Sequence, residues 1–262
     1  MPAPIYTAEN VRPAYQLDWS LTVFWKRAIG SDSWLAELQS ATEKDGVRIL
    51  SHRFSTKGCS LFLLSTLPAV RPVDAVRSIK GRLQTLIRST LPQAFLRNYD
   101  LHSVGSTTRA KAEAYVTSQL EHHAESLAVV THQLADLQWI DPDVDLSAEQ
   151  FSAHARHRCN LHLSFVCQDR RTGIGIPLLV AVRNMIRRAC AAKKVRLSRI
   201  GLLPDHLHLI VGTSHEAAPI ELALSLMNNI AFVYGMQPIL RPSCFLGTIG
   251  EYNLGAIRQP PP

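Results

Sequence analysis

The 262-residue chain has no long apolar run: none approaches the roughly 20 residues that a membrane-spanning helix needs. Its first residues, Met1-Pro2-Ala3-Pro4, do not form a signal peptide. Cysteine is scarce, and an odd set of five argues against a disulfide scaffold and for a reducing interior. We therefore expect a cytoplasmic protein without a membrane partner.

Acidic residues are outnumbered, with 21 Asp and Glu against 28 Lys and Arg, which gives a net charge of +7. This excess suits a polyanionic partner such as nucleic acid. The chain is 46% hydrophobic and 19% charged, so it can bury a core. That composition excludes an intrinsically disordered protein.

The charge is distributed unevenly along the chain. Residues 15–122 carry +5, residues 123–157 carry −5 and residues 158–262 carry +7, whereas residues 1–14 are neutral. The acidic stretch contains Trp139-Ile140-Asp141-Pro142-Asp143-Val144-Asp145, which lacks a clear hydrophobic period. We predict a tail at 1–14, a first lobe at 15–122, an acidic linker at 123–157 and a second lobe at 158–262.

The two lobes repeat one pattern. Each opens with an apolar, β-branched run closed by a basic pair, at residues 15–27 and 159–171. Helices, further strands and a closing glycine follow in the same order. This order predicts two ferredoxin-like βαββαβ domains of the α+β class, with antiparallel sheets, paired about a pseudo-two-fold axis in one chain. The alternative is a coincidence between two α+β patterns.

Two histidines of the second lobe have the spacing of a metal site. His206 and His208 alternate along a predicted strand, so both face one side while Leu207 faces the core. Two imidazoles on one face can begin a divalent metal site. A structural pair is the alternative, but the Pro204-Asp205 lead-in and the apolar strand that follows favour the metal site.

Residues 204–209 resemble the His-hydrophobic-His (HUH) motif of the TnpA-type single-tyrosine transposases. These enzymes move insertion sequences as single-stranded DNA, and the repeat-associated tyrosine transposases are their relatives. Residues 162–171 resemble the opening strand of the family, and residues 245–250 resemble the glycine-containing segment before its nucleophile helix. The resemblance covers residues 158–259 and, more faintly, 15–122.

In that family, a helix after the glycine segment carries the nucleophilic tyrosine, and a glutamine four residues later completes the metal site. The first lobe has Tyr115 and Gln119 on one face of such a helix. The second lobe has Pro260 at the tyrosine position, and no glutamine follows in the sequence. Conversely, our alignment gives the first lobe Gly58 and Ser60 in place of the two histidines.

Each lobe has therefore lost what the other keeps. The enzymes of the family are homodimers whose two sites are each shared between subunits, so the complementary loss predicts a fused dimer with one composite site. The resemblance implies Tyr115 as the nucleophile, and His206, His208 and Gln119 as ligands of Mg²⁺ or Mn²⁺. It also implies cleavage and rejoining of single-stranded DNA, with hairpin or palindromic structure, through a 5′-phosphotyrosine. The chain would act as a monomer that is an internal pseudo-dimer.

Several other features have a structural alternative. A basic set could contact DNA phosphates or form a solvated helix face: Arg187, Arg188, Lys193 and Lys194. A second set imitates a zinc cluster, but Cys159 and His162 fall on opposite faces of a strand: His154, His157, Cys159 and His162. Tyr234 lies among apolar residues and is interpreted as helix packing.

Two other functions remain open. The first is a catalytically inactive, host-adopted protein that binds single-stranded DNA or hairpins. The second is a ribonucleoprotein or scaffold module, because βαββαβ sheets also bind RNA. Neither lobe has the basic-aromatic strand motif of such RNA binders, which disfavours that option.

Overall fold

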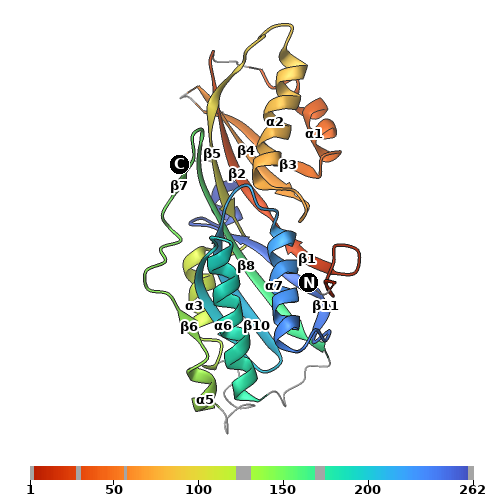
Figure 1. Cartoon of the computed structure of the whole chain (residues 1–262). Coiled ribbons are helices and arrows are strands. Elements are labelled where there is room, and N and C mark those ends of the chain that lie inside the picture. The colour runs from red at the N-terminus through yellow and green to blue at the C-terminus, as the bar shows by residue number, and fades with distance from the viewer. Residues whose placement is uncertain (1–2, 28–30, 56–57, 122–130, 169–174, 259–262) are drawn as a thin grey trace.

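A computed structural model gives the fold of residues 3–27, 31–55, 58–121, 131–168 and 175–258 (Figure 1). In chain order the elements are β1 (Arg12–Gln16), β2 (Asp18–Trp25), α1 (Leu35–Glu43), β3 (Val47–Ser55), β4 (Cys59–Thr66), α2 (Pro72–Ile87), β5 (Phe95–Val104), α3 (Arg109–Thr117), α5 (Thr131–Ala135), β6 (Trp139–Ile140), β7 (Gln150–Phe151), β8 (Ala155–Cys167), α6 (Ile176–Ala192), β9 (Arg196–Leu202), β10 (His206–Thr213), α7 (Pro219–Val233), β11 (Leu240–Ile249) and α8 (Leu254–Arg258). The predicted α+β class with a mainly antiparallel sheet is confirmed.

The first lobe consists of β2 to β5 with α1 and α2. Its strands lie in the order β3-β4-β2-β5, and every neighbouring pair is antiparallel. Alternate residues of β2, namely Trp19, Leu21 and Val23, are buried in a core with α1 and α2. Pro72 occupies the first turn of α2 with Asp74 just after it, and both residues favour a helix start.

The second lobe consists of β8 to β11 with α6 and α7. Its strands lie in the order β9-β10-β8-β11, again antiparallel, and α6 packs beside α7 on one face of the sheet (Figure 1). Leu161, Leu163 and Phe165 of β8 are buried in that helix-covered core. The residues between them face the other side of the sheet, which is called the α3 face below because α3 lies on it.

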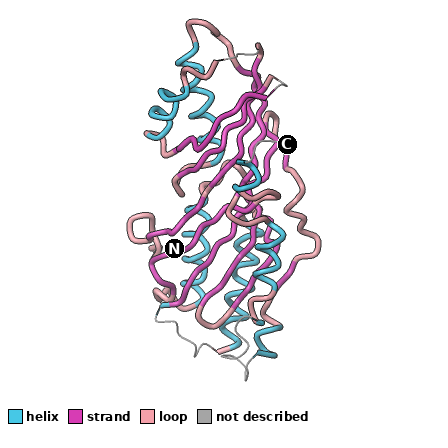
Figure 2. The backbone as a smooth tube through the Cα atoms, turned by 180° about the vertical axis from the view of Figure 1, so that it is seen from behind, coloured by secondary structure: helices cyan, strands magenta, loops and turns pink. Residues whose placement is uncertain are grey.

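One sheet of 11 strands runs through both lobes, and Figure 2 shows it from behind. The prediction of separate antiparallel sheets is therefore wrong at the junction. The strand β8 begins at Ala155, within the predicted linker, and its first residues pair in parallel with β5. The predicted strand of residues 15–23 also breaks at Leu17, which is buried in the core of the second lobe, and β1 pairs in parallel with β11.

The described part of the acidic linker packs against the second lobe. Leu134, Leu137 and Leu146 are fully buried, and β6 pairs with β9. Buried leucines fix the path of this segment more strongly than its charges do, because apolar burial is the larger contribution to stability. Within the described ranges, no helix has the length and apolarity needed to cross a membrane.

Candidate active site

The helix that carries Tyr115 belongs to the first half of the chain but lies on the second lobe. It begins after Thr108, whose side-chain oxygen accepts a hydrogen bond from the backbone N–H of Lys111. Ala112 and Val116 of α3 form a small core with Ile210 and residues around it. The helix therefore covers the face of the second sheet that α6 and α7 leave uncovered.

Two glycines allow the chain to reach that position. After β5 and β11 the two segments cross, and the N–H of Arg109 donates to the carbonyl of Gly250 at 2.7 Å while the N–H of Leu254 donates to that of Gly105 at 2.9 Å. A side chain at Gly105 would overlap the carbonyl oxygen of Thr248, and one at Gly250 would overlap the backbone of the first lobe. The crossing thus requires glycine at both positions.

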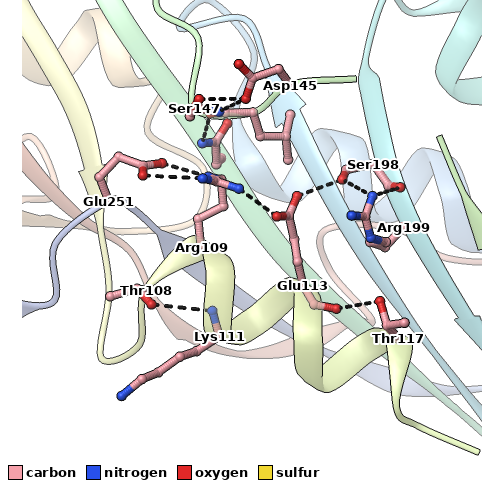
Figure 3. A network of polar contacts seen from close by, with 12 residues as sticks. Thr108, Arg109, Lys111, Glu113, Thr117, Asp145, Ser147, Ser198, Arg199 and Glu251 are labelled. Carbon is pink, nitrogen blue, oxygen red and sulfur yellow. Dashed lines mark hydrogen bonds and ion pairs between the residues drawn. The ribbon is translucent and has the colours of Figure 1, made fainter. Parts of the chain in front are cut away.

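A polar network anchors the start of α3 to the second lobe (Figure 3). Arg109 donates to Glu251 at 2.7 Å and to Glu113, one turn further along α3, at 2.6 Å. The second carboxylate oxygen of Glu113 accepts a hydrogen bond of 2.7 Å from the Ser198 hydroxyl on β9. These side chains are largely buried, so the charge-assisted bonds hold the helix firmly in place.

The structure brings together the four residues that the sequence predicted for the site. His206 and His208 of β10 both lie on the α3 face, and the ring of Tyr115 is 5.6 Å from the ring of His208 between centroids. The amide nitrogen of Gln119 is 3.3 Å from Nε2 of His206. Tyr115 is 44% exposed, so this residue is partly open to solvent.

Both histidines have a partner at Nδ1. The Asp205 carboxylate is 2.7 Å from Nδ1 of His206, and Nε2 of His162 is 2.9 Å from Nδ1 of His208. Burial lowers the pKa of His162 to about 4, so this imidazole is neutral at pH 7. From the sequence, His162 was assigned to the family's opening strand and to a set that imitates a zinc cluster, and its place in this site was missed. The usable signal is its parity in β8, which places it on the same face as the histidines of β10.

One distance in the proposed donor set agrees with two ligands of the same octahedral ion. Ligand atoms about 2.1 Å from an ion and at right angles to each other lie about 3 Å apart. The separation of 3.3 Å between the Gln119 amide and His206 Nε2 is close to this value, and half a turn of the amide would present its oxygen instead. Among the described residues, no group of three or more His, Cys, Asp or Glu could hold a metal. A set of three protein donors at this place would therefore include the glutamine.

The strand of the first lobe that corresponds to β10 is β4, and it carries no histidine. Our sequence alignment of Gly58 and Ser60 with His206 and His208 is shifted by one residue. In that lobe β4 lies between β3 and β2 as β10 lies between β9 and β8. Ser60 accepts a hydrogen bond from Trp25 and faces the helix-covered core, so it is not the counterpart of His208. The residues on the corresponding face are Cys59 and Leu61.

The basic set lies away from the tyrosine, on the helix-covered side of the sheet. Arg187 lies 4.8 Å from the ring centroid of Trp139. Arg187, Arg188 and Lys194 line an open groove of about 1070 Å³ with Trp139, while Lys193 lines a neighbouring hollow.

The other candidate residues from the sequence have packing or pairing roles in the described part of the chain. Cys159 is buried on the helix-covered side, opposite His162, and His157 pairs with His215 at 3.2 Å. Tyr234 ends α7 and packs against the second core, where burial raises its pKa to about 12. Pro260 and the pair Arg170-Arg171 lie outside the described residues.

Comparison with known proteins matches part of the chain to a family. Residues 155–234, which run from β8 to the end of α7, match the model of the family described as "Transposase IS200 like". The chain matches none of the curated proteins. The matched segment contains His162, His206 and His208 but not α3.

Solved structures add little. A "putative glycine cleavage system transcriptional repressor" has a TM-score of 0.24 and 9% identity over 90% of this chain and 98% of that one. An unknown protein from Galdieria sulphuraria has a TM-score of 0.23 and 9% identity over 89% and 99%. The aspartate kinase from Synechocystis has a TM-score of 0.19 and 8% identity over 81% and 54%. Such scores are too low to support an inference, whereas the family match supports a transposase-type role in DNA processing.

Proposed function

We propose that the chain cleaves and rejoins single-stranded DNA at one composite site, with Tyr115 as the nucleophile. The observation that carries this proposal is the position of α3, which places a tyrosine of the first lobe 5.6 Å, ring to ring, from a histidine of the second. Of the four proposed site residues, the family match includes only the two histidines. The roles of the tyrosine and the glutamine come from the resemblance in sequence, and this geometry supports them.

In the proposed reaction, the Tyr115 oxygen forms a bond to phosphorus and the bond from phosphorus to the 3′-oxygen breaks. The tyrosine loses its proton and the departing 3′-oxygen gains one, which leaves a 5′-phosphotyrosine and a free 3′-hydroxyl. The phosphotyrosine is still a phosphodiester, so a 3′-hydroxyl can reverse the step and join strands without ATP. Mg²⁺ or Mn²⁺, held by His206, His208 and Gln119, would supply charge stabilisation to the phosphate.

The same proposal includes the organisation of the chain. We assign residues 15–122 and 158–262 to two ferredoxin-like repeats that form a pseudo-dimer within a monomer, with a tail at 1–14 and a connector at 123–157. The reciprocal crossing at Gly105 and Gly250 supports this pairing, because each glycine accommodates the backbone of the other lobe. The DNA would be a strand with hairpin or palindromic structure.

The test is a covalent adduct. The purified chain is incubated with Mn²⁺ and single strands taken from palindromes that flank the gene, each labelled at its 3′ or its 5′ end. A 5′-phosphotyrosine retains the 3′ label on the protein through SDS, and the 5′ label is released. Tyr115→Phe should abolish the adduct and Tyr252→Phe, on an exposed tyrosine, should not. An adduct that persists in Tyr115→Phe contradicts the proposal.

A second test concerns the metal. His206→Ala and His208→Ala should each remove Mn²⁺-dependent cleavage, and Gln119→Ala should weaken Mn²⁺ binding less, because it removes a neutral oxygen ligand. Unchanged Mn²⁺ affinity in both histidine variants contradicts the site.

The groove beside Trp139 favours one alternative, an inactive DNA-binding protein. That alternative predicts salt-sensitive binding of single strands with no adduct under any metal.

A further inference from the structure

The proposed site contains a third imidazole whose role is not accounted for. His162 lies on β8, diagonally across from His208, and the two rings are 5.1 Å apart between centroids. Its neighbours on either side are also aromatic: the ring of Phe245 is 5.7 Å away and that of Tyr115 is 6.4 Å away. The ring of His162 therefore has three aromatic neighbours, and its Nε2 is directed at Nδ1 of His208.

We propose that His162 is a positioning residue: it accepts a hydrogen bond from the Nδ1–H of His208 and so makes Nε2 the metal-binding nitrogen of that histidine. The inference rests on the proposed function, because it assigns the orientation of one ligand of that site. A neutral imidazole carries one donor and one acceptor, and the bond made by one nitrogen fixes the state of the other. In this arrangement His162 carries its own proton on Nδ1.

The geometry favours positioning over direct ligation by His162. Its Nε2 is 2.9 Å from Nδ1 of His208, a hydrogen-bond distance, and lies on the side of that ring away from Nε2. His206 is held in the same way by a different group, since its Nδ1 is 2.7 Å from the Asp205 carboxylate. One ligand is thus oriented by a carboxylate and the other by a neutral ring. Partners of this kind fix the tautomer and ring direction of metal-binding histidines.

Loss of the His162 ring nitrogen should weaken metal binding by His208. Without a partner at Nδ1, the proton of His208 would distribute between the two nitrogens, and the fraction with its proton on Nε2 could not bind a metal there. Loss of such a partner costs about 10- to 100-fold in metal affinity. A residue that only filled space would show no such effect when replaced by a ring of similar size.

The first measurement uses the metal-free, unmodified protein. Proton–nitrogen NMR of the histidine rings reports which nitrogen carries the proton, and His208→Ala assigns the resonances. We expect His208 to be protonated at Nδ1 and His162 to accept at Nε2. A His208 protonated mainly at Nε2 in the folded protein would overturn the proposal without any His162 variant.

The second measurement is Mn²⁺ affinity by calorimetry without DNA. His162→Phe keeps a ring but no nitrogen and should weaken binding at least tenfold. His162→Gln keeps an acceptor and should restore affinity to within about threefold of the wild type. His154→Phe, the same change at an exposed histidine, is the matched control and should bind normally. If His162→Phe does not fold, the glutamine variant and the NMR spectrum still decide.

The outcomes separate this inference from the proposed function. Unchanged affinity and an unchanged His208 tautomer in His162→Phe refute the positioning role, even where the wild type forms its DNA adduct. A loss as complete as that of His208→Ala makes His162 a ligand and also refutes it. If the wild type forms no adduct but His162→Phe weakens Mn²⁺ binding tenfold, the function fails and the positioning role stands.

Discussion

Gly201 is a sensitive position for testing how the tyrosine helix is seated. It lies on β9, and a Cβ added there would be 3.0 Å from Cγ1 of Val116 and 3.1 Å from the Val116 carbonyl oxygen. Both atoms belong to α3, one residue beyond Tyr115. Gly201→Ala therefore acts on the tyrosine helix from a strand 86 residues away from Tyr115 in the sequence. Its added Cβ would also lie 3.6 Å from Cβ of the proposed ligand Gln119, an ordinary contact that requires no displacement.

The expected displacement follows from those distances. A comfortable contact of about 3.5 Å requires the Val116 backbone to move outward by about 0.4 Å. A misplacement of about 1 Å can cost 10²-fold in rate, so a shift of this size should slow adduct formation about fivefold to tenfold. The stability cost should be only about 1 kcal/mol, because crowding is partly offset by the lower chain entropy of alanine.

The assay compares the initial rate of adduct formation with the midpoint of urea unfolding. Gly212→Ala is the control, since it adds the same atom on neighbouring β10 but meets the side-chain ends of Leu146 and Arg196 instead of the helix. The account predicts that Gly201→Ala loses more rate than Gly212→Ala at equal or smaller loss of stability. Equal rates in Gly201→Ala and the wild type would show that α3 does not pack on β9.

Three further predictions concern stability and binding. Arg109→Met should cost about 2 kcal/mol in urea unfolding because its bonds to two carboxylates are removed, whereas exposed Lys111→Met should cost little. Burial, with His215 nearby, lowers the pKa of His157 from 6.5 to about 4, so the folded state binds fewer protons in this range and should lose about 3 kcal/mol as pH falls through it. His157→Gln should flatten that dependence in melts at pH 7 and 5, and an equally steep fall would contradict the assignment. The last variant has glutamine at Arg187, Arg188, Lys193 and Lys194. It should reduce the slope of log affinity against log salt for single-stranded DNA by about 0.7 for each phosphate that is no longer neutralised. An unchanged slope would show that the DNA binds elsewhere.

Sequence periodicity could predict which residues share a face. Helical spacing predicted Tyr115 and Gln119 on one helix face, but α3 ends at Thr117 and Gln119 lies in the turn beyond it. Alternation along a strand placed His206 and His208 together, as expected. The relation between the two histidines is local, because backbone geometry fixes it within one strand. Proline followed by an acidic residue likewise marked the starts of α2 and α7.

Relations between distant elements were harder to predict. An apolar residue such as Leu17 could be buried in the core of either lobe. The residues next to it in the sequence do not indicate that it enters the core of the second lobe and divides the predicted first strand. The counterpart of His208 was misplaced by one residue, because the weak similarity of β4 and β10 leaves their register open and a shift of one reverses the face. The role of His162 depends on the pairing of β8 with β10, since its partner is on another strand.

The central claim is that one chain supplies both halves of a single site, and a mixing experiment tests it most directly. Tyr115→Phe and His208→Ala, each expected to be inactive, are mixed at equal concentration and incubated with Mn²⁺ and a 3′-labelled strand on which the wild type forms an adduct. The account predicts that the mixture stays as inactive as either variant, because α3 is anchored to the second lobe of its own chain and every site carries one defect. An adduct in the mixture well above that of either variant would show that the halves come from different chains and would contradict the account.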